Sequence, residues 1–340
     1  MATSIPDISA AIQRLRSGGV VAFPTETVYG LGADALNEQA VRRVYELKGR
    51  PRINPLIVHV SGPEMAARLV NEWTAEADAL AKMFWPGPLT MVLPRVMNEA
   101  ASAAGSMDRS ALVLPDLVTA GGATVGVRCP DHPVALALLF GLGSPLVGPS
   151  ANPSGGISPT LALHVAESFS AEDVLVLEGG ACRAGIESTV VSLAGDHPRI
   201  LRPGLIGAGE IAAVIGRRVE QGPTANLPGE PLASPGLLAR HYAPKTPARL
   251  VELSVIAEVM HDVGSKGQIA AVLTHRAFEV RPPHHMLLLP DDAEEYAYHI
   301  YAALREADGL RADVILIARP PSEEGAWGAI LDRLTRATTE

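Results

Sequence analysis

Residues 48–60, with the sequence KGRPRINPLIVHV, combine basic side chains and prolines with an apolar segment typical of a strand. Lys48, Arg50 and Arg52 carry positive charge in a chain whose formal net charge is −9. The prolines restrict the backbone, which lowers the entropic cost of holding cations beside a ligand. The positive charge is therefore local, and we expect an anion to bind at this loop.

A helix is predicted immediately before the loop. Apolar residues recur at helical spacing over residues 38–48, Asn37 can cap the first turn, and Gly49 can end the helix in a left-handed conformation. Lys48 then lies at the end of the helix and Arg50 just beyond it. Taken alone, the same pattern also fits a solvated basic helix end that complements the helix dipole.

The composition is that of a globular protein of about two domains. Of the 340 residues, 47% are hydrophobic and 19% are charged, which is enough apolar material for folded cores. The negative net charge argues against a broad surface for nucleic acid or anionic membranes. Cys129 and Cys182 lie far apart without CxxC spacing, so neither a zinc site nor a disulfide is indicated. With neither a signal-peptide nor a membrane-span pattern, a cytoplasmic protein is expected.

Several motifs place small polar or basic residues at the ends of predicted strands. FPTETVYGLG (residues 23–32) follows a buried strand, TVGVR ends in Arg128, and ILRPG contains Arg202. GPSANPSGG (residues 148–156) is a turn rich in serine and glycine. Arginines at strand ends can bind carboxylates or phosphates, and such turns can hold phosphates through backbone N–H groups. Each motif alone also fits an ordinary turn, but one concave anion-binding site explains all of them.

Two segments of the first 212 residues have less distinct patterns. Residues 66–80 are rich in alanine and predict one helix, whereas residues 95–113 have little periodicity and predict an inserted loop. His59 ends the strand after the basic loop and, taken alone, fits a buried histidine with a structural role. No Walker motif, GxGxxG motif or nucleophile elbow is present.

The sequence changes in character after about residue 209. Residues 219–247 are rich in proline and glycine, which predicts a linker. Predicted strands then alternate with helices, which is typical of a small α/β domain with a parallel sheet. The predicted organisation is a catalytic domain at 1–212, a linker or lid at 213–247, and a small Rossmann-like α/β domain at 248–340.

Seven motifs stand in a characteristic order along the chain, namely FPTETVYGLG, KGRPRINPLIVHV, FWPGPLT, TVGVRCPDHP, GPSANPSG, GIESTVV and ILRPG. In this order they closely resemble the YrdC-like threonylcarbamoyl-AMP synthase family. SPGLLARHYAP and the final AILDRL resemble its longer, two-domain form, the L-threonylcarbamoyladenylate synthases. The chain departs from the family at Leu238 and Ala239, where relatives often have lysine and tyrosine, and at Ala123, where an acidic residue is frequent.

The resemblance implies a fold and a reaction. The fold would be α/β, with a YrdC-like twisted mixed sheet whose helices help to form a concave anion-binding site. The enzyme would be a nucleotidyltransferase that converts L-threonine, bicarbonate and ATP to L-threonylcarbamoyl-AMP and pyrophosphate, with Mg²⁺ on the ATP phosphates. The product would pass to the machinery that forms N6-threonylcarbamoyladenosine in tRNA.

The resemblance also implies roles for residues at matching positions. L-Threonine would be bound by Thr27, His59, Arg128, Gly148 and Ser188. ATP would be bound by Arg50, Asn54, Thr124, Ser150, Arg202 and Tyr242. Lys48 and Arg50 would act in catalysis, next to the phosphates or the bicarbonate. No protein ligands to a metal are implied.

Two alternative functions remain open at this point. The basic concavity could belong to an RNA-binding module, although one compact patch in an acidic chain fits a small anion better. A carbamoyl-nucleotide enzyme with another acceptor would resemble only the catalytic half. Weak RNA contact is compatible with the patch, and no membrane contact is expected.

The linker is longer than an ordinary connection between domains. We expect residues 219–247 to fold over the active site as a lid, with the C-terminal domain as its anchor, because a labile adenylate needs shielding from water. Arg240, His241 and Tyr242 would then present a cation and an aromatic ring to the nucleotide. A flexible tether is the alternative.

Overall fold

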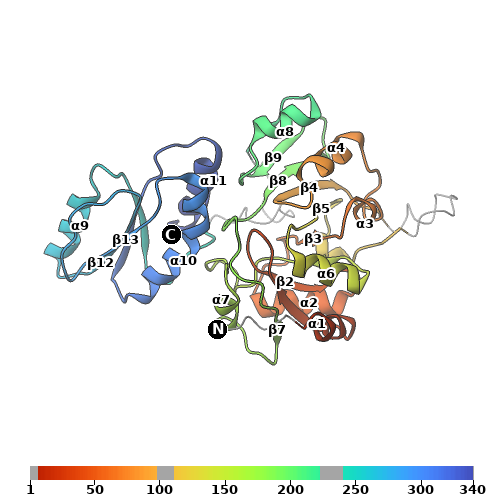
Figure 1. The fold of residues 1–340 in the computed structure, drawn as a ribbon, viewed down its shortest axis with the longest axis horizontal. Helices are drawn as coiled ribbons and strands as arrows, with labels where there is room; N and C mark the ends of the chain where they lie inside the picture. Colours follow the sequence, from red (N-terminus) through yellow and green to blue (C-terminus); the bar gives the residue numbers. More distant parts are fainter. Residues whose placement is uncertain (1–6, 98–110, 223–239, 340) are drawn as a thin grey trace.

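The computed structural model describes residues 7–97, 111–222 and 240–339, and they form two sheets with separate helical layers (Figure 1). Most of the predicted inserted loop, most of the predicted linker, and Leu238 and Ala239 lie outside these described residues. In the ranges that are described, no helix is both long and apolar enough to cross a bilayer.

The larger sheet is mixed, with the strand order β10-β9-β8-β4-β5-β3-β6-β2-β1-β7. The central pair β3 and β5 is parallel, β4 pairs with β5 in antiparallel fashion, and β4 pairs with β8 in parallel. The strands are β1 (Val20–Phe23), β2 (Gly30–Asp34), β3 (Ile57–His59), β4 (Leu89–Pro94), β5 (Thr124–Arg128), β6 (Leu146–Val147), β7 (Val174–Val176), β8 (Thr189–Ser192), β9 (Arg199–Arg202) and β10 (Glu220–Gln221). The mixed α/β sheet agrees with the predicted fold.

Short helices cover this sheet and bury apolar side chains against it. They are α1 (Ile8–Arg16), α2 (Glu38–Lys48), α3 (Pro63–Ala67), α4 (Ala75–Phe84), the 3₁₀ helix η1 (Asp116–Thr119), α6 (Pro133–Leu142), α7 (Ala162–Ala166) and α8 (Ala208–Ile215).

The prediction of one helix over residues 66–80 is wrong, because the structure has two helices separated by residues 68–74. Val70 forms a bridge with Arg95, and the N–H of Asn71 donates to the carbonyl of Pro94 at 2.9 Å. Thr74 then caps α4 by accepting from the N–H of Ala77. Tertiary pairing at this point outweighs the helical propensity of the alanines.

The basic loop is reached through α2 in the way that the sequence predicts. The Asn37 side chain accepts hydrogen bonds from the N–H groups of Gln39 and Ala40, and Gly49 ends the helix with a φ of 59°. Glycine tolerates this left-handed conformation without the steric cost that a Cβ brings. The helix therefore ends at Lys48 and delivers Arg50 to the end of the sheet.

The smaller sheet is entirely parallel, as predicted, with the order β11-β14-β12-β13. Its elements are β11 (Ala248–Val251), α9 (Ile256–Ser265), β12 (Ala270–Thr274), β13 (His285–Leu288), α10 (Ala293–Gly309), β14 (Val314–Ala318) and α11 (Gly325–Ala337). The central strands β12 and β14 are buried throughout, which explains their continuous apolar runs. Figure 1 shows α10 and α11 on the side that faces the larger sheet and α9 on the opposite side.

One apolar cluster joins the two parts of the molecule. Val28, Ile157 and Ile186 from loops of the larger part pack with residues of α10 and α11, and Tyr242 belongs to the same cluster. Buried apolar area is the main favourable term in such an association. The interface brings the second sheet's helices next to the strand-end loops that carry the predicted site.

Candidate active site

A small cavity lies where the loops at the strand ends of the larger sheet meet Tyr242. The predicted site residues that line it are Thr27, Arg50, His59, Arg128, Gly148, Ser150, Arg202 and Tyr242. Its further lining residues include Glu187 and His241. The cavity has a volume of about 40 Å³, whereas ligand pockets commonly have roughly 300–1,000 Å³. A nucleotide can therefore enter only if lining side chains move.

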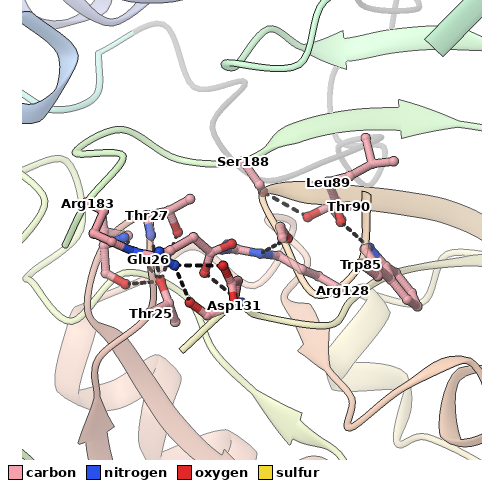
Figure 2. Close-up of polar contacts among 12 residues, drawn as sticks. Thr25, Glu26, Thr27, Trp85, Leu89, Thr90, Arg128, Asp131, Arg183 and Ser188 are labelled. Atoms are coloured by element: carbon pink, nitrogen blue, oxygen red, sulfur yellow. Dashed lines mark hydrogen bonds and ion pairs between the residues drawn. The ribbon is translucent and has the colours of Figure 1, made fainter. Parts of the chain in front are cut away.

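Arg128 is held in the cavity wall by a buried ion pair (Figure 2). Its Nη2 lies 2.6 Å from Oε1 of Glu26, and its Nε donates to the carbonyl of Gly87 at 3.3 Å. The other carboxylate oxygen of Glu26 accepts from the N–H of Asp131 at 3.1 Å. Both charged side chains are 5% exposed. The guanidinium is thus fixed in orientation at the end of β5, which suits recognition of a ligand carboxylate.

Hydroxyl groups form two buried pairs near Arg128 (Figure 2). The hydroxyls of Thr25 and Thr27 are 2.9 Å apart, and those of Thr90 and Ser188 are 2.8 Å apart. Arg202 donates from Nη2 to the Ser188 hydroxyl at 3.1 Å and from Nε to the Ser188 carbonyl at 3.1 Å. Ser188 therefore connects Arg202 to the hydroxyl pair near Arg128, and its hydroxyl is placed to bind a small polar ligand.

Two basic residues of the segment 48–60 have different positions: Arg50 lines the cavity, and Lys48 supports the turn next to it. Arg50 lines the cavity, and its side chain donates to the Asn54 side-chain oxygen at 2.7 Å and to the Pro55 carbonyl at 2.7 Å. Burial lowers the pKa of Arg50 to about 10, so it stays charged at neutral pH. The Lys48 Nζ instead donates to the carbonyls of Ser150 and Asn152, at 2.6 and 2.5 Å. Lys48 thereby fixes the serine–glycine turn at residues 148–156.

Buried polar atoms without a hydrogen-bond partner gather at this site. Among the described residues they include Nδ2 of Asn54, Nδ1 of His59, Nδ1 of His241 and the Tyr242 hydroxyl. Such atoms are uncommon in folded proteins and call for a partner such as a ligand or water. Burial, and then Arg128, lower the pKa of His59 well below its usual value, so its imidazole is neutral. The site therefore offers arginine cations together with free neutral donors and acceptors.

Gly148 makes the close approach to His59 possible. A Cβ added at this position would lie 2.6 Å from Nδ1 of His59 and 3.0 Å from the Phe23 ring. Real Cβ atoms do not approach other atoms so closely, and the glycine backbone therefore forms this part of the cavity wall.

Thr124 is the predicted residue that the structure places elsewhere. It lies at the start of β5, four residues before Arg128, and lines a second hollow of about 360 Å³ together with Val92, Ser192 and Arg199. Because side chains two residues apart share a face of a strand, Thr124 and Arg128 lie on the same face of the sheet. Thr124 in the second hollow and Arg128 in the cavity wall therefore belong to the same face of β5, although the two hollows share no lining residue.

Glu26 and Glu187 are the site carboxylates that the sequence reasoning did not single out. Glu26 lies inside FPTETVYGLG, a motif that we attribute to the anion-binding site, and Glu187 lies inside GIESTVV, one of the seven motifs of the family resemblance. A carboxylate inside such a motif is itself a signal, because it needs an internal cation to be buried. Throughout the described ranges, no three His, Cys, Asp or Glu side chains are grouped so that they could hold a metal ion.

The fold and the site together define an α/β protein with a cavity lined by arginines and small polar side chains, which suits an anionic ligand. A family model described as "Telomere recombination", for the Sua5, YciO and YrdC proteins, matches residues 13–204. A second model, described as "Threonylcarbamoyl-AMP synthase, C-terminal domain", matches residues 206–339.

Similar proteins span nearly the whole chain. The threonylcarbamoyl-AMP synthase of Pyrococcus abyssi is 39% identical over 95% of this chain and 92% of its own length. That of Bacillus subtilis is 40% identical over 99% and 94%. The crystal structure of P. abyssi Sua5 complexed with L-threonine superposes with a TM-score of 0.87 and 39% identity, covering 97% of this chain and 94% of that one. The chain belongs to the threonylcarbamoyl-AMP synthase family.

Proposed function

We propose that this chain converts L-threonine, bicarbonate and ATP to L-threonylcarbamoyl-AMP and pyrophosphate. The proposal rests on the observation that one cavity contains two groups of basic residues. Arg128 lies near buried hydroxyls and suits L-threonine, while Arg50 and Arg202 suit the phosphates of ATP. Similarity to synthases of this name over the whole chain supports it and does not favour the RNA-binding alternative. The product would be consumed by a reaction that modifies tRNA.

The threonine half would lie around Arg128. Its guanidinium, fixed by Glu26, would bind the threonine carboxylate, while Thr27, Ser188 and neutral His59 would bind the amine and hydroxyl. The amine attacks the carbon of bicarbonate and water leaves, which gives a carbamate. Carbamates are unstable in water, so the enclosing loops would protect it. Gly148 would contribute its backbone to the threonine site, beside the His59 ring that a Cβ at this position would displace.

The ATP half would lie around Arg50 and Arg202, with Asn54, Ser150, Thr124 and Tyr242 as further contacts. The carbamate oxygen attacks the α-phosphorus, and the bond to pyrophosphate breaks. Such a reaction depends on positioning and on cations more than on a protein nucleophile. Arg50 would stabilise the charge that develops on the phosphates, and Lys48 would act by holding the turn at Ser150.

Mg²⁺ would reach the site with ATP. Glu187, which lines the cavity, is engaged by Arg333, and Glu26 is engaged by Arg128, so the phosphates rather than the protein would supply most of its ligands. When bound, the ion would supply positive charge to the phosphates. Arg50 and Arg202 would remain the cations that the chain itself provides to the phosphates, with Lys48 supporting the turn at Ser150.

A product assay tests the proposed function. Pyrophosphate release should require L-threonine and bicarbonate together, and threonylcarbamoyl-AMP should be detected by its mass. Reactions with L-serine, without amino acid and without bicarbonate serve as controls. Equal pyrophosphate release in all of them would refute the proposal.

A further inference from the structure

Glu187 is a cavity carboxylate that is held mainly from the second part of the molecule. Its Oε2 accepts hydrogen bonds from Nε of Arg333 at 3.0 Å and from the Tyr301 hydroxyl at 2.9 Å. Its Oε1 accepts from the Ser158 hydroxyl at 2.6 Å. Arg333 lies on α11 and Tyr301 on α10, so two of these three partners belong to the C-terminal α/β part. Arg333 is 1% exposed.

An uncompensated carboxylate at this position would oppose the binding of a polyanion. Glu187 lines the same cavity as Arg50 and Arg202, the two arginines that we assign to ATP. Burial raises the pKa of Glu187, but Arg333 and then Arg202 outweigh this effect and lower it to about 2. The carboxylate is therefore charged at neutral pH. Charges inside a protein are poorly screened, so a bare carboxylate would repel phosphates strongly.

We propose that Arg333 is a positioning residue that neutralises Glu187 from α11, so that ATP can bind beside Arg50 and Arg202. The inference rests on the proposed function, because it takes ATP as the anion. The Arg333 guanidinium carbon also lies 5.5 Å from the centroid of the Tyr242 ring. One side chain of the C-terminal part therefore contacts two groups that line the cavity. The active site is electrostatically incomplete without α11.

The first variant is Arg333→Met, which retains a long buried side chain and removes the charge. We expect ATP binding, measured by calorimetry on the full chain, to weaken at least tenfold. Arg333→Lys keeps a cation at this position and should lose less than the methionine variant. Arg319→Met is the matched control in the same C-terminal part, since its side chain pairs with the exposed carboxylates of Glu252 and Glu323, and wild-type affinity is expected.

The second variant adds Glu187→Gln and distinguishes charge from packing. If Arg333 acts by neutralising Glu187, the Arg333→Met, Glu187→Gln double variant should recover most of the lost ATP affinity. Glutamine cannot replace a packing role of the arginine, so a merely structural effect would not be rescued. If Arg333→Met alone fails to fold, the double variant is compared with Glu187→Gln instead. In the Glu187→Gln background there is no carboxylate to neutralise, so removal of Arg333 should change ATP affinity less than threefold.

Two results would overturn the inference. One is wild-type ATP affinity in Arg333→Met, and the other is a tenfold loss on removal of Arg333 in the Glu187→Gln background. Product formation by the wild-type chain is measured in parallel. A wild-type chain that binds ATP and forms no threonylcarbamoyl-AMP would refute the proposed function, whereas ATP affinities across the variants decide the role of Arg333 separately.

Discussion

At the scale of single residues, loss of the Glu26–Arg128 pair should lower the free energy of unfolding strongly. Its two side chains are almost completely buried and 2.6 Å apart. Glu26→Gln would leave the Arg128 charge uncompensated in the interior, and we expect a loss of about 3–5 kcal/mol in the free energy of unfolding. Urea unfolding without substrates measures this loss.

A neighbouring ion pair on the surface provides the control for that prediction. Arg183 and Asp131 are 2.7 Å apart, but their side chains are 68% and 50% exposed. Solvated pairs contribute about 0–1 kcal/mol, so Asp131→Asn should cost little. Equal losses for Glu26→Gln and Asp131→Asn would show that burial does not strengthen the inner pair.

The residues that the sequence predicted well are those whose role follows from their own chemistry. Arg50, Arg128 and Arg202 stand at strand or helix ends in local motifs, and the structure brings them to one cavity. Glu187 was not predicted, because its meaning depends on Arg333, which lies 146 positions later. A carboxylate inside the motif can indicate a buried charge, but the local sequence does not show which distant cation pairs with it.

At the scale of elements, α2 and the turn at residues 148–156 act as one unit through Lys48. Its Nζ donates to the carbonyls of Ser150 and Asn152, while the Ser154 N–H donates to the Lys48 carbonyl at 2.7 Å. Lys48→Met would leave two carbonyls without this donor, at a cost of about 1–3 kcal/mol for each unsatisfied group. We expect activity to fall at least tenfold and amide exchange in the turn to become faster.

Arg52→Met is the matched control for the turn. Arg52 is an exposed cation of the same loop, four positions from Lys48. Its loss should leave both activity and the exchange of the turn amides at wild-type values. If Lys48→Met lowers activity while the turn amides keep their protection, Lys48 acts on the substrates directly rather than through the turn.

Element prediction succeeded where local signals are complete. Asn37 and Gly49 specify both ends of α2, and the apolar runs of β12 and β14 specify buried parallel strands. It failed at residues 66–80, where alanines on both sides favour a helix but residues 68–74, which contain no alanine, are interrupted by the pairing of Val70 with Arg95. Alanine carries no information about tertiary partners, so its pattern could not indicate the break.

At the scale of the whole molecule, the cavity depends on an interface that composition alone could not predict. The apolar cluster of α10 and α11 includes Val28, Ile157 and Tyr242, which belong to or adjoin the cavity loops. We infer that the C-terminal part supports the cavity as well as its own sheet. We propose domain boundaries at residues 212 and 247. The sequence predicted two α/β parts, but not that helices of one would complete the site of the other.

The stability of the whole molecule should fall as the pH is lowered from neutral. Burial, as the largest cause, lowers the pKa of His59 well below its usual value, that of His164 to about 4, and that of His241 to about 3. In the unfolded chain each histidine titrates near a pKa of about 6.5. Between these values the unfolded chain binds more protons than the folded one, so protons favour unfolding.

Urea unfolding at pH 7.5 and pH 5.5 checks this prediction, and His164→Asn isolates the share of one histidine. Each histidine should contribute at most about 1.4 kcal/mol to the difference, or about 4 kcal/mol for the three. Asparagine can accept the hydrogen bond that Nδ1 of His164 accepts from the Thr160 N–H, and it does not titrate. The variant should therefore lose at most about a third of the pH dependence. Equal stability of the wild-type chain at both pH values would mean that these histidines titrate within the fold as they do in the unfolded chain, so that His59 would be protonated at pH 5.5 instead of staying neutral.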